Sequence, residues 1–273
     1  MSEPRSTRVA VAQITSTAEV AANLDAVDRT VRLAAAQGAE FVLVPECFAY
    51  LGPERGKLAL VEPLPEGGPI LARCQALARD AGVSLVLGGF WERGPEPTRA
   101  FNACVHLRAD GTVAAIYRKI HLFDVDLADG TRVVESDTLT PGDAIVTTST
   151  PFGPLGLSIC YDLRFPELYR RLVERGAVAL AVPAAFTLMT GKDHWEVLLR
   201  ARAIESQAYV LAAGQTGRHF GTRVSYGHSM IIDPWGTVLA QCGEGEGVAV
   251  ATIEPSLVSR VRRQLPSLAH RRL

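Results

Sequence analysis

The 273-residue sequence lacks any long apolar segment. Its first residues, Met-Ser-Glu-Pro-Arg-Ser-Thr, have no hydrophobic stretch after the basic residue, and no apolar run elsewhere approaches the roughly 20 residues of a membrane-spanning helix. Neither sign of charge dominates, because 28 basic residues balance 29 acidic residues to a net charge of -1. The sequence therefore gives no electrostatic reason to expect nucleic acid or a membrane as partner. It predicts a cytoplasmic protein that acts on small molecules.

Cysteines are few and are not spaced for a disulfide framework or a zinc site. An odd number of scattered cysteines fits a reduced compartment. Within the predicted helices no histidine pairs with a carboxylate at helical spacing, so we expect no metal. The five cysteines are Cys47, Cys74, Cys104, Cys160 and Cys242.

The chain also lacks a domain-splitting linker, a low-complexity tract and a short-period repeat. Its length is sufficient to bury a substantial core. We therefore expect one domain that spans residues 1–273.

The order of predicted elements indicates an α/β fold. Residues 8–13 form a valine-rich strand, a helical pattern begins at a capping box at residues 16–19 and ends at Gly38, and residues 41–44 form an apolar strand. A strand, a helix and a strand within about forty residues imply a parallel sheet with the helix on its face.

The rest of the chain repeats this order and adds antiparallel strands. Asp110-Gly111 is a hairpin signal, so the sheet is mixed, and residues 121–143 are predicted to be a long functional loop. Further predicted helices are 69–81, 165–175, 193–208 and 255–264; further predicted strands are 83–90, two within 102–120, 145–148, 155–159, 178–182, 209–213, 228–233, 238–242 and 248–253.

Cys160 stands at the carboxyl end of the apolar strand 155–159, just before a helix with Pro166 in its first turn. Open α/β folds place their chemistry at this edge of the sheet, and the amino-terminal end of a helix favours a thiolate. A free cysteine is more often a buried core residue. The position alone therefore does not identify Cys160 as catalytic, and the prediction depends on the residues expected near it.

Two other strand ends carry Glu46 and Lys119, and Glu135 lies in the long loop that could cover the same site. A carboxylate can accept the proton of a thiol, while an ammonium lowers the thiol pKa and stabilises an oxyanion. Together with Cys160 these groups are suited to amide hydrolysis. Spacing alone does not prove that they meet, and a glutamate at a strand end is more often a solvated loop residue.

Three short motifs resemble the catalytic motifs of the nitrilase superfamily of carbon-nitrogen hydrolases, in the order of the family. They are Val-Pro-Glu at Glu46, Tyr-Arg-Lys-Ile-His-Leu-Phe-Asp around Lys119, and Ile-Cys-Tyr-Asp-Leu-Arg-Phe-Pro-Glu around Cys160. The resemblance covers nearly the whole chain. It implies a nitrilase-type α-β-β-α four-layer sandwich with mixed sheets, a homodimer that associates through helices, and no cofactor.

The resemblance also implies a role for each residue. Glu46 is the general base, Cys160 is acylated, and Lys119 holds the oxyanion together with the backbone N–H of Tyr161. Water activated by Glu46 then cleaves the thioester. Glu135 corresponds to a second glutamate, which orients Lys119 and the substrate.

Further segments resemble the branch of this family that contains omega-amidases and deaminated-glutathione amidases. The expected substrate is a small 2-oxo acid amide, namely deaminated glutathione, which yields 2-oxoglutarate and cysteinylglycine. The alternative is 2-oxoglutaramate or 2-oxosuccinamate, with release of ammonia. The segments are Thr190-Gly191, His194-Trp195-Glu196, Leu199-Arg200-Ala201-Arg202-Ala203, Tyr226-Gly227-His228-Ser229 and Asp233-Pro234-Trp235-Gly236.

Arginines are the candidates for binding the substrate carboxylates. Arg164 lies where the branch places carboxylate recognition, although a structural salt bridge explains it equally well. Arg218 or Arg223 could clamp the glycine carboxylate, or either could be a solvated loop residue. Phe186 and Thr187 complete the expected substrate-binding residues. The segment 125–143 is more similar to omega-amidases, which keeps that alternative open.

Three rival functions have less support in the sequence. An acyltransferase or an ammonia-supplying domain would need an appended domain or a transmembrane portion. A non-catalytic binding protein would be favoured by a substituted triad, and none of the three residues is substituted. A thiol redox protein would need a resolving cysteine near Cys160 in sequence.

Overall fold

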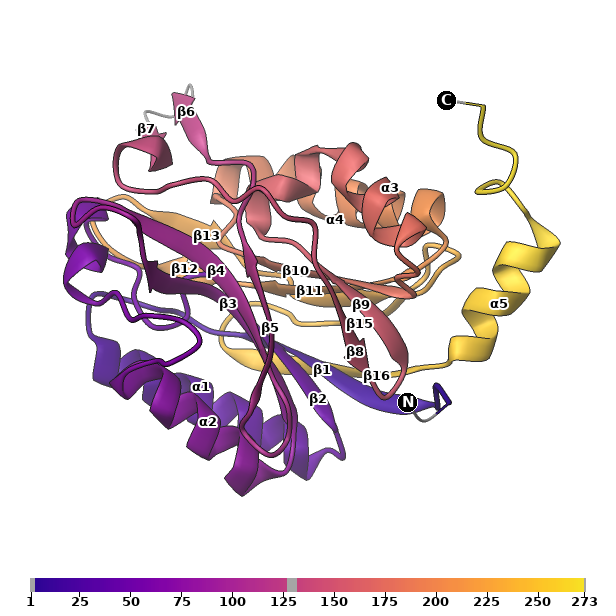
Figure 1. Ribbon diagram of the computed structural model, residues 1–273, viewed down its shortest axis with the longest axis horizontal. Helices are drawn as coiled ribbons and strands as arrows, with labels where there is room; N and C mark the ends of the chain where they lie inside the picture. The colour runs from indigo at the N-terminus through magenta and orange to yellow at the C-terminus, as the bar shows by residue number, and fades with distance from the viewer. Residues whose placement is uncertain (1–2, 127–131, 273) are drawn as a thin grey trace.

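The computed structural model describes residues 3–126 and 132–272, which are arranged in four layers (Figure 1). Two six-stranded mixed sheets lie face to face at the centre. This arrangement confirms the predicted α-β-β-α sandwich. One pair of helices covers the outer face of each sheet: α1 (Val20–Ala36) and α2 (Pro69–Ala81) on the first, α3 (Pro166–Glu174) and α4 (Leu188–Ser206) on the second.

The first sheet joins strands from the amino-terminal half to one late strand. β1, β2 and β3 are parallel, as the predicted strand-helix-strand order requires, whereas β4, β5 and β16 are antiparallel to their neighbours. In spatial order the strands are β16 (Gly247–Ile253), β1 (Thr7–Gln13), β2 (Phe41–Val44), β3 (Ser84–Arg93), β4 (Ala100–Leu107) and β5 (Val113–Arg118).

The second sheet has the same mixed character. β9, β10 and β11 are parallel, and β8, β14 and β15 are antiparallel at the two edges. In spatial order its strands are β15 (Val238–Gln241), β14 (Met230–Ile232), β11 (Tyr209–Gly214), β10 (Ala179–Ala184), β9 (Gly153–Leu157) and β8 (Thr147–Thr150).

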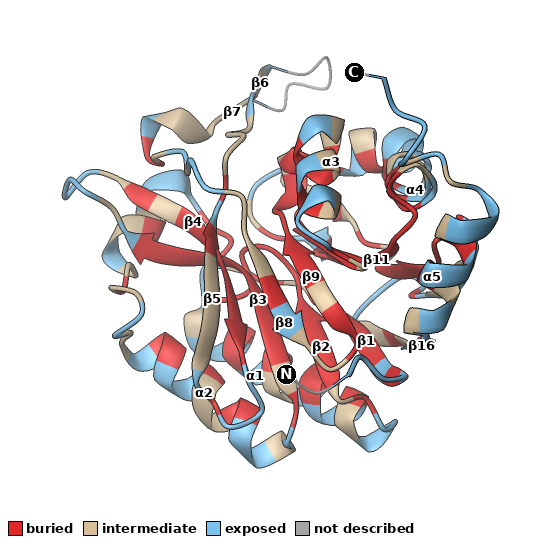
Figure 2. Cartoon of the chain, turned by 45° about the vertical axis from the view of Figure 1, so that its right-hand side comes forward, coloured by how far each residue is buried: buried red, intermediate tan, exposed pale blue. Residues whose placement is uncertain are grey.

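The main core lies between the sheets and follows the two-residue period of the strands. In β1, Val9 and Val11 face the second sheet, while Ala10 and Ala12 face the helices on the other side. The central strands are buried on both faces, and the exposed residues lie on the outer helices (Figure 2). Each valine-sized side chain contributes roughly 1.5–3 kcal/mol when it is buried. The sheets therefore form a rigid platform for the residues at the strand ends.

The sheets come very close together beside the strand ends that carry the predicted site. A Cβ atom at Gly88 in β3 would lie 2.1 Å from Cβ of Pro183 in β10. Only glycine fits this approach without moving the sheets apart. The β3–β4 register shifts between Leu87 and Phe90 at the same place.

The predicted capping box at residues 16–19 is wrong. α1 begins at Val20 without a side-chain cap. Ser16 Oγ instead donates to the carbonyl oxygen of Phe48, and the side chain of Asn23 binds both backbone groups of Thr17. The hydroxyl of Ser16, which the local pattern assigned to the helix cap, makes a tertiary contact instead.

Two further expectations need correction. α4 begins at Leu188, five residues before the predicted start, because the side chain of Thr187 accepts a hydrogen bond from the N–H of Thr190. The described parts of the predicted loop 121–143 contain short elements: β6 (Asp124–Asp126), β7 (Arg132–Val134) and the 3-10 helix η2 (Glu135–Asp137).

The remaining short elements also lie outside the two sheets. The hairpin of β12 and β13 was not predicted. These elements are the 3-10 helices η1 (Glu54–Ala59) and η3 (Cys160–Arg164), the hairpin β12 (Thr216–Arg218) and β13 (Val224–Tyr226), and the predicted helix α5 (Pro255–Gln264).

Candidate active site

The ends of three strands bring Glu46, Lys119 and Cys160 together. Glu46 follows β2, Lys119 follows β5, and Cys160 begins η3 shortly after β9. Lys119 Nζ lies 3.2 Å from Glu46 Oε1, and the charges of Glu46 and Lys119 both act on the pKa of the Cys160 thiol. All three residues are buried. The structure therefore shows that these three groups lie together, which their spacing in the sequence could not establish.

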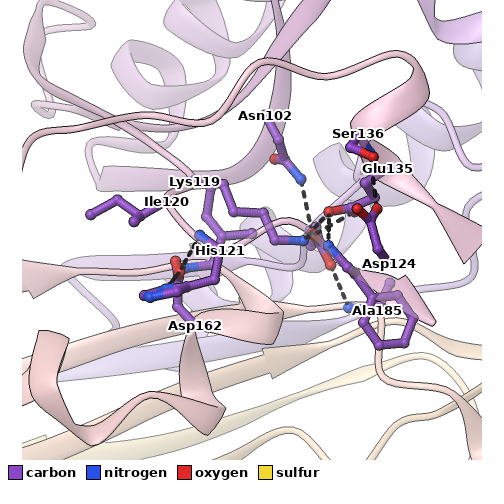
Figure 3. A network of polar contacts seen from close by, with 12 residues as sticks. Asn102, Lys119, Ile120, His121, Asp124, Glu135, Ser136, Asp162 and Ala185 are labelled. Atoms are coloured by element: carbon purple, nitrogen blue, oxygen red, sulfur yellow. Dashed lines mark hydrogen bonds and ion pairs between the residues drawn. The ribbon is translucent and has the colours of Figure 1, made fainter.

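Lys119 is held between two carboxylates. Its Nζ donates to Glu135 Oε1 at 3.0 Å and to Glu135 Oε2 at 2.8 Å, in addition to Glu46 (Figure 3). The backbone N–H of Phe123 also donates to Glu135 Oε2. Burial works against the charge on Lys119, but the two carboxylates outweigh burial and raise its pKa well above the usual value. Lys119 is therefore a fixed ammonium.

Glu46 is fixed by donors that only the tertiary structure brings near. Asn102 Nδ2 donates to its Oε1 at 2.9 Å, and the backbone N–H of Ala185 donates to its Oε2 at 3.0 Å. Burial tends to raise the pKa of Glu46, but Lys119, Cys160 and Asn102 together hold it below the usual value. The carboxylate is therefore ionised and able to accept a proton.

The sequence analysis missed Asn102. The only signal was an amide in the middle of the otherwise apolar strand Ala100–Leu107, and the strand register was needed to aim it at Glu46. Its Oδ1 is buried and has no hydrogen-bond partner among the described residues.

The ammonium of Lys119 does not by itself decide the pKa of the Cys160 thiol. Burial, followed by the charge of Glu46, raises the pKa of the thiol well above its usual value, and Lys119 only partly offsets this. Cys160 is therefore a neutral thiol next to an ionised carboxylate. Such a thiol becomes a nucleophile only when a neighbouring base takes its proton, and the position of Glu46 suits that role.

The turn at Cys160 is strained and is held in place by Asp162. Cys160 has a φ of 46°, in the left-handed region that few residues other than glycine adopt. The buried carboxylate of Asp162 accepts hydrogen bonds from the N–H of Ile159 at 2.9 Å and from the hydroxyl of Tyr117 at 2.7 Å. Tyr161 follows in the first turn of η3, where N–H groups have no acceptor within the helix. This position suits the predicted oxyanion role of its N–H.

A cavity of about 340 Å³ opens onto these groups. Glu46, Lys119, Glu135 and Cys160 line it, and aromatic side chains form part of its wall. Three cationic side chains also line it: Lys57, Arg132 and Arg223.

The two candidate loop arginines, Arg218 and Arg223, have different surroundings in the structure. Arg223 lines the cavity, and its Nη2 donates to the carbonyl oxygen of Ala185 at 3.0 Å. Its Nε and Nη1 are buried and have no hydrogen-bond partner among the described residues. Arg218 is exposed, is absent from the described lining of the cavity, and donates to the carbonyl oxygen of Gly221. Of the two, only Arg223 belongs to the described lining of the cavity, and it has two buried nitrogens that lack a hydrogen-bond partner.

Arg164, Phe186 and Thr187 lie in a small crevice on another side of Cys160. The Arg164 guanidinium carbon is 5.3 Å from the centre of the Phe186 ring, and Arg164 Nη1 lies 3.3 Å from Nδ1 of His194. These residues border the nucleophile, but they are not part of the described lining of the large cavity.

Neither a membrane-spanning helix nor a metal-binding group of side chains occurs among the described residues. Residues 3–126 and 132–272 contain no helix long and apolar enough to cross a bilayer. In the same part of the chain, no group of three or more His, Cys, Asp or Glu side chains is arranged to hold a metal ion.

Residues 8–263 match the sequence pattern of the carbon-nitrogen hydrolase family. The chain is 46% identical over 269 residues to the deaminated glutathione amidase of Homo sapiens, covering 97% of this chain and 82% of that protein. It is also 46% identical to the protein of that name from Synechocystis sp., covering 96% of this chain and 97% of that protein. The crystal structure of Saccharomyces cerevisiae Nit3, a member of the nitrilase superfamily, is similar with a TM-score of 0.85 and 30% identity, covering 96% of this chain and 95% of that chain.

Proposed function

This chain belongs to the carbon-nitrogen hydrolase family, and we propose that it hydrolyses deaminated glutathione to 2-oxoglutarate and cysteinylglycine. It is an amide-hydrolysing enzyme, and the two relatives that share 46% of its residues are named for this substrate. The observation that supports the substrate is a cationic side chain in the cavity of the nucleophile, Arg223, two of whose buried nitrogens lack a hydrogen-bond partner among the described residues. Such a group suits a substrate with a carboxylate on the leaving peptide.

In the acylation step, we propose that Glu46 takes the proton from Cys160 as the sulfur attacks the amide carbonyl. Lys119 and the N–H of Tyr161 stabilise the oxyanion that forms on the carbonyl oxygen. The C–N bond breaks, the proton on Glu46 passes to the leaving nitrogen, and cysteinylglycine departs. A thioester between Cys160 and the 2-oxoglutaryl group remains.

In the deacylation step, Glu46 takes a proton from water, which attacks the thioester carbonyl. The same donors stabilise the second oxyanion, and the proton returns to the sulfur of Cys160 as 2-oxoglutarate leaves. Glu135 keeps Lys119 oriented throughout, because it accepts two of the hydrogen bonds of the ammonium.

We assign Arg223 to the glycine carboxylate of the leaving dipeptide. Its Nε and Nη1 lack a hydrogen-bond partner among the described residues, and either N–H can donate to a carboxylate oxygen. Arg164, with Phe186 and Thr187, borders Cys160 in the small crevice, outside the described lining of the large cavity.

The test compares deaminated glutathione with 2-oxoglutaramate, with detection of both cysteinylglycine and ammonia. We expect a higher kcat/KM for deaminated glutathione, and Arg223→Ala should lower only this value, by roughly 10- to 100-fold for a lost charged hydrogen bond. Arg218→Ala should have a smaller effect. A higher kcat/KM for 2-oxoglutaramate would replace this proposal with the omega-amidase alternative.

We also propose that the enzyme is a cytoplasmic homodimer. The resemblance to the family suggests association through helices, and apolar side chains are exposed on and beside α4. The exposed fractions are 67% for Val197, 49% for Ile204 and 61% for Trp235. Such a patch favours contact with a second copy.

A further inference from the structure

Lys57 is a buried cation in the wall of the catalytic cavity whose function the mechanism leaves open. The chain has three lysines, and the other two are the catalytic Lys119 and the exposed Lys192. The side chain of Lys57 is only 5% exposed, although it belongs to the short surface helix η1. Burial of an ammonium is costly unless it is paired or bound.

The surroundings of Lys57 compensate its charge only in part. Its Nζ lies 4.7 Å from the centre of the Trp91 ring, whose indole N–H points to the carbonyl oxygen of Tyr50. The one carboxylate partner is Glu54, three residues earlier in η1, and the side chain of Glu54 is 45% exposed. An ammonium has three N–H donors, so this arrangement leaves donors for a ligand in the cavity.

A purely structural role does not explain this position. An exposed lysine and glutamate three residues apart would stabilise η1 equally well, and such pairs contribute little. Its burial against the Trp91 ring instead places a desolvated ammonium in the wall of the cavity, where an anion can reach it. Glu54 can turn into solvent when an anion arrives, because nearly half of its side chain is exposed.

We propose that Lys57 binds the carboxylate of the 2-oxo acid in the acyl half of the substrate. This proposal rests on the proposed function, because the substrate then carries one carboxylate on the acyl group and another on the leaving peptide. Besides Lys119 the described lining contains three cations, of which Arg132 is exposed, whereas Lys57 is buried beside Trp91 and Arg223 has two buried, unpartnered nitrogens. Lys57 and Arg223 thus provide one cation for each carboxylate.

The order of the reaction decides which cation takes which carboxylate. The leaving peptide must depart while the acyl group is still bonded to Cys160. It therefore needs the more open part of the cavity, where Gly221 and Thr222 are exposed next to Arg223. The acyl group remains for the second step and suits the enclosed wall of Lys57 and Trp91, both of which are buried.

Three amide substrates distinguish the role of Lys57 from that of Arg223. Deaminated glutathione has both carboxylates, 2-oxoglutaramate has only the acyl carboxylate, and butanoyl-cysteinylglycine has only the leaving-group carboxylate. The variants are Lys57→Met, which keeps most of the volume, Arg223→Ala, and Lys192→Met as the matched control on the exposed lysine. Thermal unfolding and turnover of butanoyl-cysteinylglycine show whether Lys57→Met is correctly folded.

We expect Lys57→Met to lower kcat/KM roughly 10- to 100-fold for deaminated glutathione and for 2-oxoglutaramate, mainly through a higher KM. Its kcat/KM for butanoyl-cysteinylglycine should stay within about twofold of the wild type on the same scale. Arg223→Ala should show the complementary pattern, with loss on the two dipeptide amides only. Lys192→Met should match the wild type on all three.

Equal losses on all three amides would assign Lys57 a structural role and overturn the proposal. A loss limited to the two dipeptide amides would place it on the leaving side, and no loss would remove it from substrate binding. Failure of the wild type to release cysteinylglycine would refute the proposed function alone, because 2-oxoglutaramate would still test Lys57.

Discussion

A buried thiol next to a buried carboxylate is a poor nucleophile until its proton moves, so Cys160 and Glu46 must act as a unit. We predict that Cys160→Ser and Cys160→Ala lose at least about 10²-fold in kcat, because a hydroxyl is much harder to deprotonate and a methyl group cannot form a thioester. Mass spectrometry should detect an acyl adduct on Cys160 in the wild type. Full activity of Cys160→Ala would refute the mechanism.

The other cysteines provide the control for this prediction. Cys74 is buried in the core between the first sheet and its helices, and its pKa is raised to about 12 by burial. Cys74→Ala should cost about 1 kcal/mol of stability and leave kcat unchanged.

Asn102 tunes the base, and this can be measured as a pH dependence. Its amide donates to the ionised form of Glu46 and therefore helps to lower the pKa of that carboxylate. Asn102→Ala removes a donor from the charged form, so the pKa of Glu46 should rise. Because the base works only when ionised, the acidic limb of kcat/KM should move to higher pH, with a loss of roughly tenfold at neutral pH.

A matched control is Asn23→Ala, which removes a buried amide that binds the backbone of Thr17 and Ala49 and, among the described residues, makes no hydrogen bond to the Glu46 carboxylate. It should lower stability and leave the acidic limb in place. An unchanged acidic limb in Asn102→Ala would mean that Asn102 does not set the pKa of Glu46.

At the scale of elements, η3 depends on one carboxylate. Asp162 accepts hydrogen bonds from Ile159, Tyr117 and His121, and it is completely buried. Asp162→Asn keeps the shape but turns an N–H₂ group toward these donors. We predict a loss of about 2–4 kcal/mol in the free energy of unfolding and a strong loss of kcat, because the Cys160 turn is no longer fixed.

Denaturant unfolding measures this change. Asp110→Asn is a suitable comparison, because Asp110 is an exposed turn residue. Its effect should stay within about 0.5 kcal/mol. If both variants were equally stable, the hydrogen bonds of Asp162 would contribute nothing to the turn.

At the scale of the whole molecule, we propose that the exposed side of α4 forms the interface of the proposed homodimer. On this proposal Val197→Glu should yield a monomer, because a charge would have to be buried in the interface. Analytical ultracentrifugation at several protein concentrations measures this. Leu33→Glu on α1, where Leu33 is 46% exposed, is the control and should leave the dimer intact. A dimer that persists in Val197→Glu would place the interface on another face.

Local sequence patterns were sufficient to predict most of the helices and strands. Apolar runs such as Phe41–Val44 and the helix from Pro69 to the left-handed Gly82 depend on side-chain periodicity and on backbone preferences that neighbouring residues determine. The predictions failed where a distant group took over a local signal, as at Ser16, or where a short hairpin such as β12–β13 had no strong pattern.

By itself, the sequence determined the α/β fold, and it pointed to Glu46, Lys119, Cys160 and Glu135 as the chemical groups. The tertiary structure decided how they act. It showed that Cys160 is a neutral thiol, that Asn102 fixes Glu46, and that Arg223 and Lys57 line the cavity while Arg218 does not. The physical reason is that burial and hydrogen bonding depend on neighbours in space. Those neighbours come from strands and loops far apart in the chain, which no local pattern encodes.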